Sequence, residues 1–584
     1  MNQITINGGS LRYLSELKEF RKGLPDGVIN KTKPDVGGTY IAANCDKNYI
    51  IVCPFKDLVD SIAADTNNKY EVFKCYGRIY EADWRKYEKS HTIKKIAVTY
   101  DSFSKKLIKW INPKDYYVVV DEYHLLLSEM DYREDAINGL IETIKSFKHY
   151  SFLSATPIDV NFEVDAFKNL PHYRITWDES DTVKVFRFKA SKLIAGVANF
   201  INKFLKEGIS INGVDVEQLF VFFNSVTGIE QMVRSLDLNP DDVKISCANT
   251  KRNRLILNEY EVEPVTNPNK KLNFFTKKGF QGCNLFSNNA LIVVVSDGNR
   301  DTSLIDISTT LEQIVGRLRE NDKYHNIFRN FIVHFYSTNN RILNDNEFKE
   351  LMDIKESEGH QLIEMTKNYT KEQMDLWSTR THLDKDVVSI VNGKLKFNEL
   401  KKQYFIYKQH LKKQYKDGFS VRNTYKDSKR FEASNQQIWD DFSLKVKKAL
   451  TVSYQTLLKN YIKTKDEDYL VDNPEFKTFC YYLKETEMNS LRWNKEKMLA
   501  RCEDYKKLDD LFRKIYKKNK FYSNDSLREY FINEFPKLYI NLKPKSTLIE
   551  SHNNIFTVSP VKKKIDGRTT RGYEVENLKL MNNE

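Results

Sequence analysis

Short runs of β-branched and aromatic residues, separated by amphipathic stretches, are the feature of this sequence that most restricts its fold. In the first part of the chain these runs are NYIIVCPF (48–55), KKIAVTYDSF (94–103), YYVVVDEYH (116–124) and YSFLSATP (150–157). Helix-like segments such as FKDLVDSIAAD and REDAINGLIETIKSF lie between them. Apolar strands that alternate with helices indicate a parallel sheet covered on both faces. In such sheets ligands bind at the carboxyl ends of the strands.

The same pattern starts again at residue 183 and continues to residue 338. Its apolar runs are VKVFRFKA, EQLFVFFNS, DDVKISCAN, LNFFTKKGF, ALIVVVSDG and NFIVHFYST. The sequence therefore predicts two α/β domains, over residues 1–180 and 181–340. After residue 340 the chain is rich in Lys, Glu, Tyr and Leu and poor in Gly and Pro, which predicts a mainly helical region over 341–584.

The end of the chain carries a different pattern. IFTVSPVKKKIDGRTTRGYEVENL (555–578) predicts a β-hairpin that turns at Asp566-Gly567. The helix-like segment SLREYFINEF precedes it, so one interpretation of about 505–580 is a winged-helix-like unit whose basic hairpin contacts phosphate.

Composition excludes several classes of protein. The 7 cysteines are scattered without a CxxC pair, and the 10 histidines show no ligand spacing, so we expect neither a disulfide framework nor a structural metal. The chain has no apolar run of about 18 residues, and NQITINGGS after Met1 does not resemble a secretory signal. We therefore expect a cytoplasmic protein without a membrane partner.

Positive charge is concentrated in one segment of a chain whose net charge is +13. Residues 401–430 hold 10 Lys or Arg against 2 Asp, which favours a polyanionic partner, with a solvated Lys-rich surface as the alternative. Aromatic residues are interleaved with these bases. They either stack on nucleic-acid bases or form the apolar stripe of a helix.

Two acidic residues follow the apolar run VVV. Asp121 and Glu122 are expected to project from the carboxyl end of a buried strand. There a carboxylate can hold Mg²⁺ while its neighbour activates a water molecule. Acids are also favoured at helix starts without any catalytic role, so the pair alone is not decisive.

Two further strings occur in a fixed order after the acids. SATP (154–157) again follows an apolar run, and TTLEQIVGRLRE (309–320) lies in the second predicted domain. Arginines of one domain that face a nucleotide on the other can stabilise the charge that develops during phosphoryl transfer. Each string recurs by chance in unrelated proteins, but all three in this order, on a pattern of two sheets, form a specific signal.

The chain resembles a superfamily 2 DExH-box helicase. DEYH matches motif II, SAT motif III and QIVGRLR motif VI, while IIVCPFKDL, VTYDSF, FVFFNSVTGIEQM and TKKGFQGCNL resemble motifs Ia, Ib, IV and V. The form GRLR is most similar to viral replicative helicases of the origin-binding type. Many members place the second arginine one position later, where this chain has Glu320, so the role of Arg319 is less certain than that of Arg317.

The resemblance covers residues 20–340 and implies two tandem RecA-like domains that bind ATP and Mg²⁺. It implies that Asp121 and Thr39 bind Mg²⁺ and that Glu122 activates water. His124, Ser154 and Thr156 would couple the nucleotide to the nucleic acid. Gln313, Arg317 and Arg319 would close over the phosphates, and Thr276 and Gly279 would lie between the phosphates and the strand.

One expected residue is absent. Motif I should contain G-x-x-x-x-G-K-[ST], but TKPDVGGTY has Gly38 at the lysine position, between Gly37 and Thr39. Either the nucleotide site is a relic, or a nearby base replaces the lysine. GVINKTKPD predicts a short strand ending near Lys31, whose side chain is placed to reach back toward the phosphates. Lys33 is the second candidate for this role.

The leading hypothesis is an ATP-driven helicase or translocase that acts on DNA, rather than RNA, in replication, recombination or repair. Its contacts would be mainly to phosphate. We expect a phage or mobile-element gene, hence host cytoplasm, and replication-protein partners bound by the C-terminal region. The alternatives are a non-catalytic nucleic-acid-binding or loading module, and a nuclease-coupled motor, for which YLVDNPEFKTF (469–479) gives only a superficial match.

Overall fold

The computed structural model describes residues 3–34, 36–178, 182–280, 283–378, 381, 383–428, 430–517, 520–552 and 555–578. The predicted domain boundary at 180 and residues 281–282 of the motif V segment lie outside these ranges. The described chain divides into two compact units. The first holds both sheets and most residues up to 451, and the second holds residues 250–252, 369–382 and the chain from 452 onward.

The first sheet has eight strands, and all of its neighbouring pairs are parallel. In spatial order they are β1 (Gln3–Gly9), β8 (His172–Trp177), β2 (Gly27–Asn30), β7 (His149–Ser154), β6 (Tyr117–Asp121), β3 (Tyr49–Cys53), β5 (Lys95–Thr99) and β4 (Val72–Cys75). Alternate residues of a strand enter different cores: Ile50 and Val52 pack on one face, and Ile51 and Cys53 on the other. This alternation explains why the strands are apolar throughout.

The helices that surround the first sheet come from the segments between its strands. They are α1 (Gly38–Asn44), α2 (Lys56–Ala64), α3 (Glu81–Ser90), α4 (Tyr100–Lys105), α5 (Leu125–Ser128), α6 (Met130–Ile144) and α7 (Asp165–Lys168). Each parallel pair of strands needs such a crossover connection, because a short turn cannot return the chain to the same edge of the sheet. The expectation of a covered parallel sheet is confirmed.

The second sheet is also parallel in all its described pairs. Its order is β13 (Val243–Ser246), β14 (Leu272–Phe275), β12 (Gln218–Phe222), β15 (Ala290–Ser296), β16 (Phe331–Tyr336), β9 (Val183–Lys189) and β19 (Phe431–Ala433), with β20 (Gln437–Ile438) also paired to β9. Helices α8 (Leu193–Glu207), α9 (Val226–Ser235), α10 (Lys251–Leu257) and α11 (Thr310–Val315) connect its strands. Strands β19 and β20 come from the region expected to be helical, which sequence reasoning missed.

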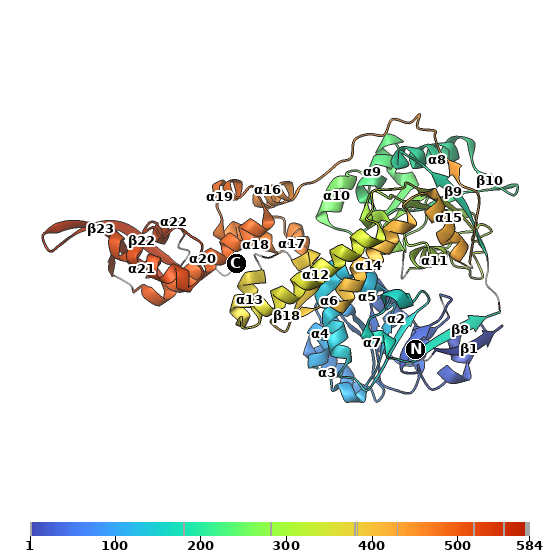
Figure 1. Cartoon of the computed structure of the whole chain (residues 1–584), viewed down its shortest axis with the longest axis horizontal. Helices are drawn as coiled ribbons and strands as arrows, with labels where there is room; N and C mark the ends of the chain where they lie inside the picture. Colours follow the sequence, from blue (N-terminus) through green and yellow to red (C-terminus); the bar gives the residue numbers. More distant parts are fainter. Residues whose placement is uncertain are drawn as a thin grey trace. The chain divides into compact units, whose positions relative to one another are not determined.

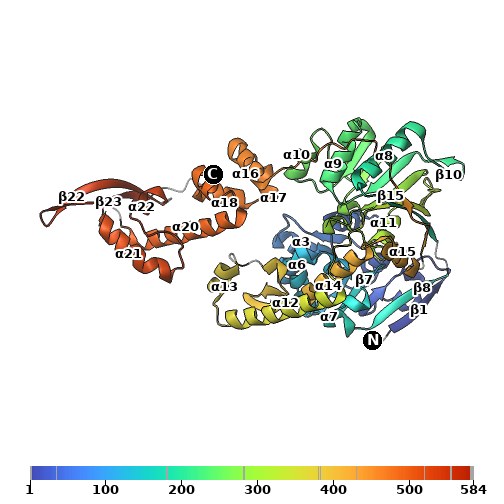
Figure 2. The same ribbon diagram turned by 45° about the horizontal axis from the view of Figure 1, so that its top comes forward.

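Helix α14 (Glu399–Gln414) joins the two sheet domains (Figure 1). Leu400 and Tyr404 pack in the core that also contains β6, whereas Leu411 and Tyr415 pack in the core of the second sheet. Lys401 is buried, and its Nζ lies 2.9 Å from the carboxylate of Glu134 in α6. Figure 2 shows α14 beside α12 (Asp345–Thr366).

The aromatic residues of 401–430 are therefore mostly structural. Tyr404, Tyr415 and Tyr425 are buried, and the last of these lies in α15 (Gly418–Asp427). Phe419, by contrast, is 68% exposed. Of the two interpretations of this segment, the apolar stripe of a helix describes most of its aromatic side chains.

The second unit is mainly helical, as predicted for the C-terminal region. It includes α13 (Lys371–Ser378), α16 (Tyr454–Thr464), α17 (Asp468–Asp472), α18 (Glu475–Tyr482), α19 (Glu485–Ser490), α20 (Lys495–Ile515), α21 (Asn524–Lys537) and α22 (Leu548–Ser551). The predicted hairpin is present as β22 (Phe556–Ile565) and β23 (Arg568–Leu578), and β21 (Phe521–Ser523) pairs with β23. Asp566 and Gly567 form its turn with positive φ. The winged-helix interpretation of this unit stays a prediction.

Candidate active site

Asp121 and Glu122 lie at the carboxyl end of β6, inside the first sheet. The chain turns sharply there, because Glu122 has a φ of 48° and its backbone N–H donates to Asp121 Oδ1 at 3.0 Å. The hydroxyl of Tyr100 donates to the backbone oxygen of Asp121 at 2.6 Å. A left-handed conformation is costly for glutamate, so the surrounding contacts hold both carboxylates in place.

Lys31 lies directly against these acids. Its Nζ is 3.9 Å from Asp121 Oδ1 and 3.9 Å from Glu122 Oε1, and the residue is 7% exposed. The position is fixed by the sheet, because the backbone N–H of Lys31 donates to Ser154 O at 2.9 Å just after β2 ends. Lys33, the second candidate, is exposed.

The buried charges shift one another's pKa values. Burial raises the pKa of Asp121 to about 6, although the charge of Lys31 opposes this. Burial would also raise the pKa of Glu122, but Lys31 and other cations outweigh it and lower that pKa. Burial lowers the pKa of His124. At neutral pH the site therefore holds an ionised Glu122 beside a neutral imidazole.

The SAT segment lies next to the acids. His124 Nδ1 and Ser154 Oγ are 2.8 Å apart, and Ser154 Oγ accepts a 3.0 Å hydrogen bond from the backbone N–H of Thr156. Glu122 Oε2 lies 3.4 Å from His124 Nδ1 and 3.5 Å from Ser154 Oγ. A chain of polar contacts thus leads from the carboxylate of motif II to motif III.

Motif VI of the second domain continues this chain of contacts. The side-chain amide of Gln313, in α11, donates to Thr156 Oγ1 at 2.9 Å. Arg317 is 5% exposed, and its guanidinium donates to the backbone oxygen and to Oε1 of Gln313 at 2.9 and 3.1 Å. A Cβ at Gly316 would lie 2.9 Å from Pro34 Cγ, so this glycine permits close approach of the two domains.

The glycine-rich loop has a steric reason for lacking a lysine. Gly37 has a φ of 82°, and α1 begins at Gly38. A Cβ on Gly38 would lie 2.4 Å from Leu153 Cδ2, a side chain that is fully buried in β7. A side chain at the place of the usual lysine would therefore require Leu153 to move. Thr39, the next residue, is half-buried.

Three expected site residues are less closely associated with the acids. Arg319 is half-buried and donates through Nε to Asn284 Oδ1 at 3.3 Å. Thr276 is buried and bonds to the backbone of Ser246. Gly279 is buried, and a Cβ there would contact the ring of Phe275, which gives this glycine a packing role.

Two contacts between the domains were missed from the sequence. Lys277 Nζ lies 3.6 Å from Glu129 Oε1, and Lys278 Nζ lies 3.6 Å from Asp57 Oδ2. Glu129 is 1% exposed, so Lys277 balances a buried charge. The TKKGF segment carries both lysines, but nothing in the sequence indicates their partners.

Two parallel-sheet domains, with acids on the first and the Gln313–Arg317 pair on the second, are the arrangement that the resemblance to a DExH-box helicase implies. Residues 35–163 of the chain match the model of the DEAD/DEAH box helicase family. This segment includes the glycine-rich loop, both acids and the SAT segment. A search of curated proteins found no significant match.

Several solved structures are similar to parts of the chain. The DEAD-box helicase Mss116 bound to ssRNA and UDP-BeF has 16% identity and a TM-score of 0.35. The match covers 54% of this chain and 67% of the Mss116 chain. The Mycobacterium smegmatis helicase Lhr bound to ssDNA and AMP-PNP has 14% identity and a TM-score of 0.35. The match covers 53% of this chain and 44% of the Lhr chain.

The ATP-dependent Type ISP restriction-modification enzyme LlaBIII bound to DNA has 11% identity and a TM-score of 0.35. The match covers 88% of this chain and 38% of the LlaBIII chain. At these identities and TM-scores the likeness assigns no role to any residue of this chain. In the described residues, no helix is long and apolar enough to cross a membrane.

Proposed function

We propose that this protein is an ATP-dependent helicase or translocase that acts on nucleic acid, with DNA as its substrate. The observation that carries the proposal is one buried polar cluster shared by both domains. It runs from Lys31, Asp121 and Glu122 through Thr156 to Gln313. A purely structural contact between domains has no need for two adjacent buried carboxylates, because their desolvation is costly.

The residues present fit a magnesium nucleotide. Asp121 and Thr39 offer oxygen ligands of the kind that Mg²⁺ prefers. When bound, Mg²⁺ would neutralise phosphate charge and thereby favour cleavage of the terminal phosphoryl group. Glu122, with its lowered pKa, can accept a proton from water at neutral pH. Arg317 comes from the other domain and would stabilise charge on the phosphoryl group only when the two domains meet.

Lys31 is the proposed replacement for the motif I lysine. It provides a buried cation beside the catalytic acids, while a side chain at Gly38 would clash with Leu153. Its ammonium group lies 3.9 Å from each carboxylate, which is longer than a hydrogen bond, so a phosphate oxygen can become its partner. The retained acids favour this proposal over a relic site.

A catalytically weakened nucleic-acid-binding or loading module is the second candidate. It is favoured by the contact of Lys31 with both acids, because a lysine that remains paired with them would leave the phosphates without a cation. Cytoplasmic location, replication-protein partners and a phage or mobile-element origin stay predictions that the site does not address.

The deciding experiment measures ATP hydrolysis by the full chain with single-stranded DNA, with single-stranded RNA and without polynucleotide. We expect stimulation, with a larger effect from DNA, and loss of turnover in Glu122→Gln with ATP binding retained. Glu350→Gln, an exposed acid on α12, serves as the control. Polynucleotide binding that ignores ATP, with no turnover under any condition, would select the binding module instead.

A further inference from the structure

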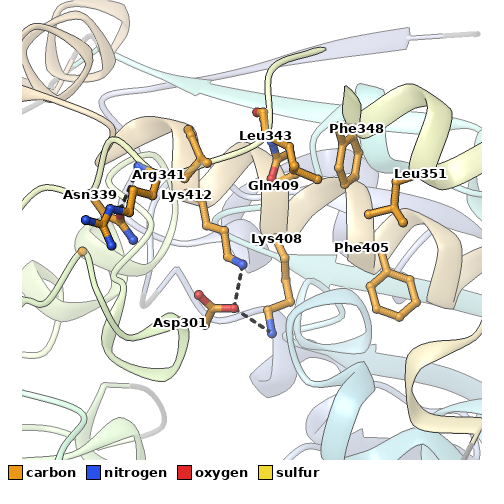
Figure 3. Close-up of a pocket in the computed structure, with 12 residues that line it drawn as sticks. Asp301, Asn339, Arg341, Leu343, Phe348, Leu351, Phe405, Lys408, Gln409 and Lys412 are labelled. Atoms are coloured by element: carbon orange, nitrogen blue, oxygen red, sulfur yellow. Dashed lines mark hydrogen bonds and ion pairs between the residues drawn. The ribbon is translucent and has the colours of Figure 1, made fainter. Parts of the chain in front are cut away.

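A pocket of about 340 Å³ lies beside the second sheet, between α12, α14 and residues 339–343 (Figure 3). Gly298 and Asp301 line it from the segment after β15, and Asn339 lines it from the segment after β16. The pocket is therefore at the carboxyl ends of these strands. This is the edge at which parallel sheets bind their ligands.

The two ends of the pocket differ in chemistry. Phe348, Leu351 and Phe405 form an apolar end, and Figure 3 shows their side chains together. Arg341 and Lys412 lie at the other end. A ligand that fills both ends must combine a flat apolar part with negative charge.

The cationic end is only partly neutralised from within. Lys408 and Lys412 both pair with Asp301, at 3.6 and 2.9 Å, so two ammonium groups share one carboxylate. The side chain of Arg341 is on the exposed surface of the same pocket. An excess of positive charge around a concave site favours an anion.

The pocket is connected to the segments that resemble motifs IV and V. The side-chain amide of Asn224 donates to Thr302 O at 2.6 Å, and its oxygen accepts from the backbone N–H of Lys277 at 3.1 Å. Thr302 is next to Asp301, so the pocket lies along the same sheet edge as these segments. A polynucleotide strand that crosses them can extend into it.

We propose that this pocket binds one nucleotide unit of a single-stranded polynucleotide. Its base packs against Phe348 and Phe405, and its phosphate pairs with Arg341 and Lys412. The proposal rests on the proposed function and adds a specific subsite to it. An acidic protein segment would satisfy the cations but would leave the aromatic end without a flat partner, so the observations favour nucleic acid.

The test compares Arg341→Glu with Lys349→Glu. Lys349 is exposed on α12 and does not line the pocket, so both variants change the net charge equally. Affinity for a fluorescent oligo(dT) is measured over a salt series on the full chain. We expect Arg341→Glu to weaken binding about tenfold and to reduce the salt slope by about one. Lys349→Glu should change the affinity less than about twofold.

A second variant removes the rings instead of the charge. Phe348→Ala/Phe405→Ala should weaken oligo(dT) binding by about fivefold or more, as expected for loss of stacking on one base, with the salt slope unchanged. Unchanged affinity in both pocket variants, with wild-type ATPase stimulated by polynucleotide, overturns the subsite and leaves the proposed function standing. Equal weakening by Lys349→Glu and Arg341→Glu also overturns it, because it shows a diffuse charge effect.

Discussion

The amide of Gln313 donates a hydrogen bond of 2.9 Å to the hydroxyl of Thr156, and this bond connects α11 of the second domain to the SAT segment of the first. Both residues are buried, at 1% and 5% exposure. A buried polar bond between two domains is stable only while the domains are in contact, since separation leaves both groups to be solvated again. Breaking this bond therefore accompanies any separation of α11 from the SAT segment.

The effects of Gln313→Ala and Thr156→Ala on ATP turnover should not be additive, because each substitution removes the same hydrogen bond. We expect each substitution to lower polynucleotide-stimulated ATP hydrolysis by about tenfold, with the double variant no slower than the worse single one. The measurement is a double-mutant cycle on kcat. Additive losses would show that the two side chains act separately.

Lys31→Ala should reduce ATP turnover by about 100-fold, because it removes a buried cation that lies 3.9 Å from both acids. Lys33→Ala is the matched control two positions away, and we expect it to retain wild-type turnover, since its side chain is exposed. Steady-state kinetics at saturating polynucleotide provide the readout. Equal activity of both variants and the wild type would exclude the relocated lysine.

Gly38→Lys restores the usual motif I residue but should harm the protein. The new Cβ would lie 2.4 Å from Leu153 Cδ2, and overpacking of this kind costs about 1–3 kcal/mol of unfolding free energy. Thermal unfolding of Gly38→Lys in the wild-type and Leu153→Ala backgrounds measures the clash. The substitution should cost less when Leu153 is shortened. A stable and faster Gly38→Lys variant would contradict the steric explanation.

Glu312 should make stability depend on pH. Burial raises its pKa from 4.5 to about 7, so the native state holds a proton that the unfolded state releases between these values. The unfolding free energy attributable to this group therefore falls as pH rises from about 4.5 to 7 and is constant above that. Glu312→Gln should match the wild type at pH 4 and exceed its melting temperature at pH 8. A wild-type advantage at pH 8 would contradict the raised pKa of Glu312.

Much of the sheet architecture follows from local sequence. Runs such as YYVVVDEYH specify strands because β-branched side chains fit a pleated surface covered on both faces. The acids and the SAT segment follow apolar runs in the sequence, and the structure places them at the ends of β6 and β7. The two β-strands at 431–438 escaped prediction because they are short, and only their pairing with β9 makes them strands.

The sequence by itself determined which residue types stand at the ends of the strands, because hydrophobic periodicity is a local property of the chain. Only the tertiary structure decided which lysine faces Asp121 and Glu122, that a side chain at Gly38 would clash with Leu153, and that α14 packs in the cores of both domains. The reason is physical. These outcomes depend on contacts between side chains that are far apart in the sequence. The packing of Leu153 against Gly38, and the charges of the buried acids near Lys31, are brought together only when the sheets have formed.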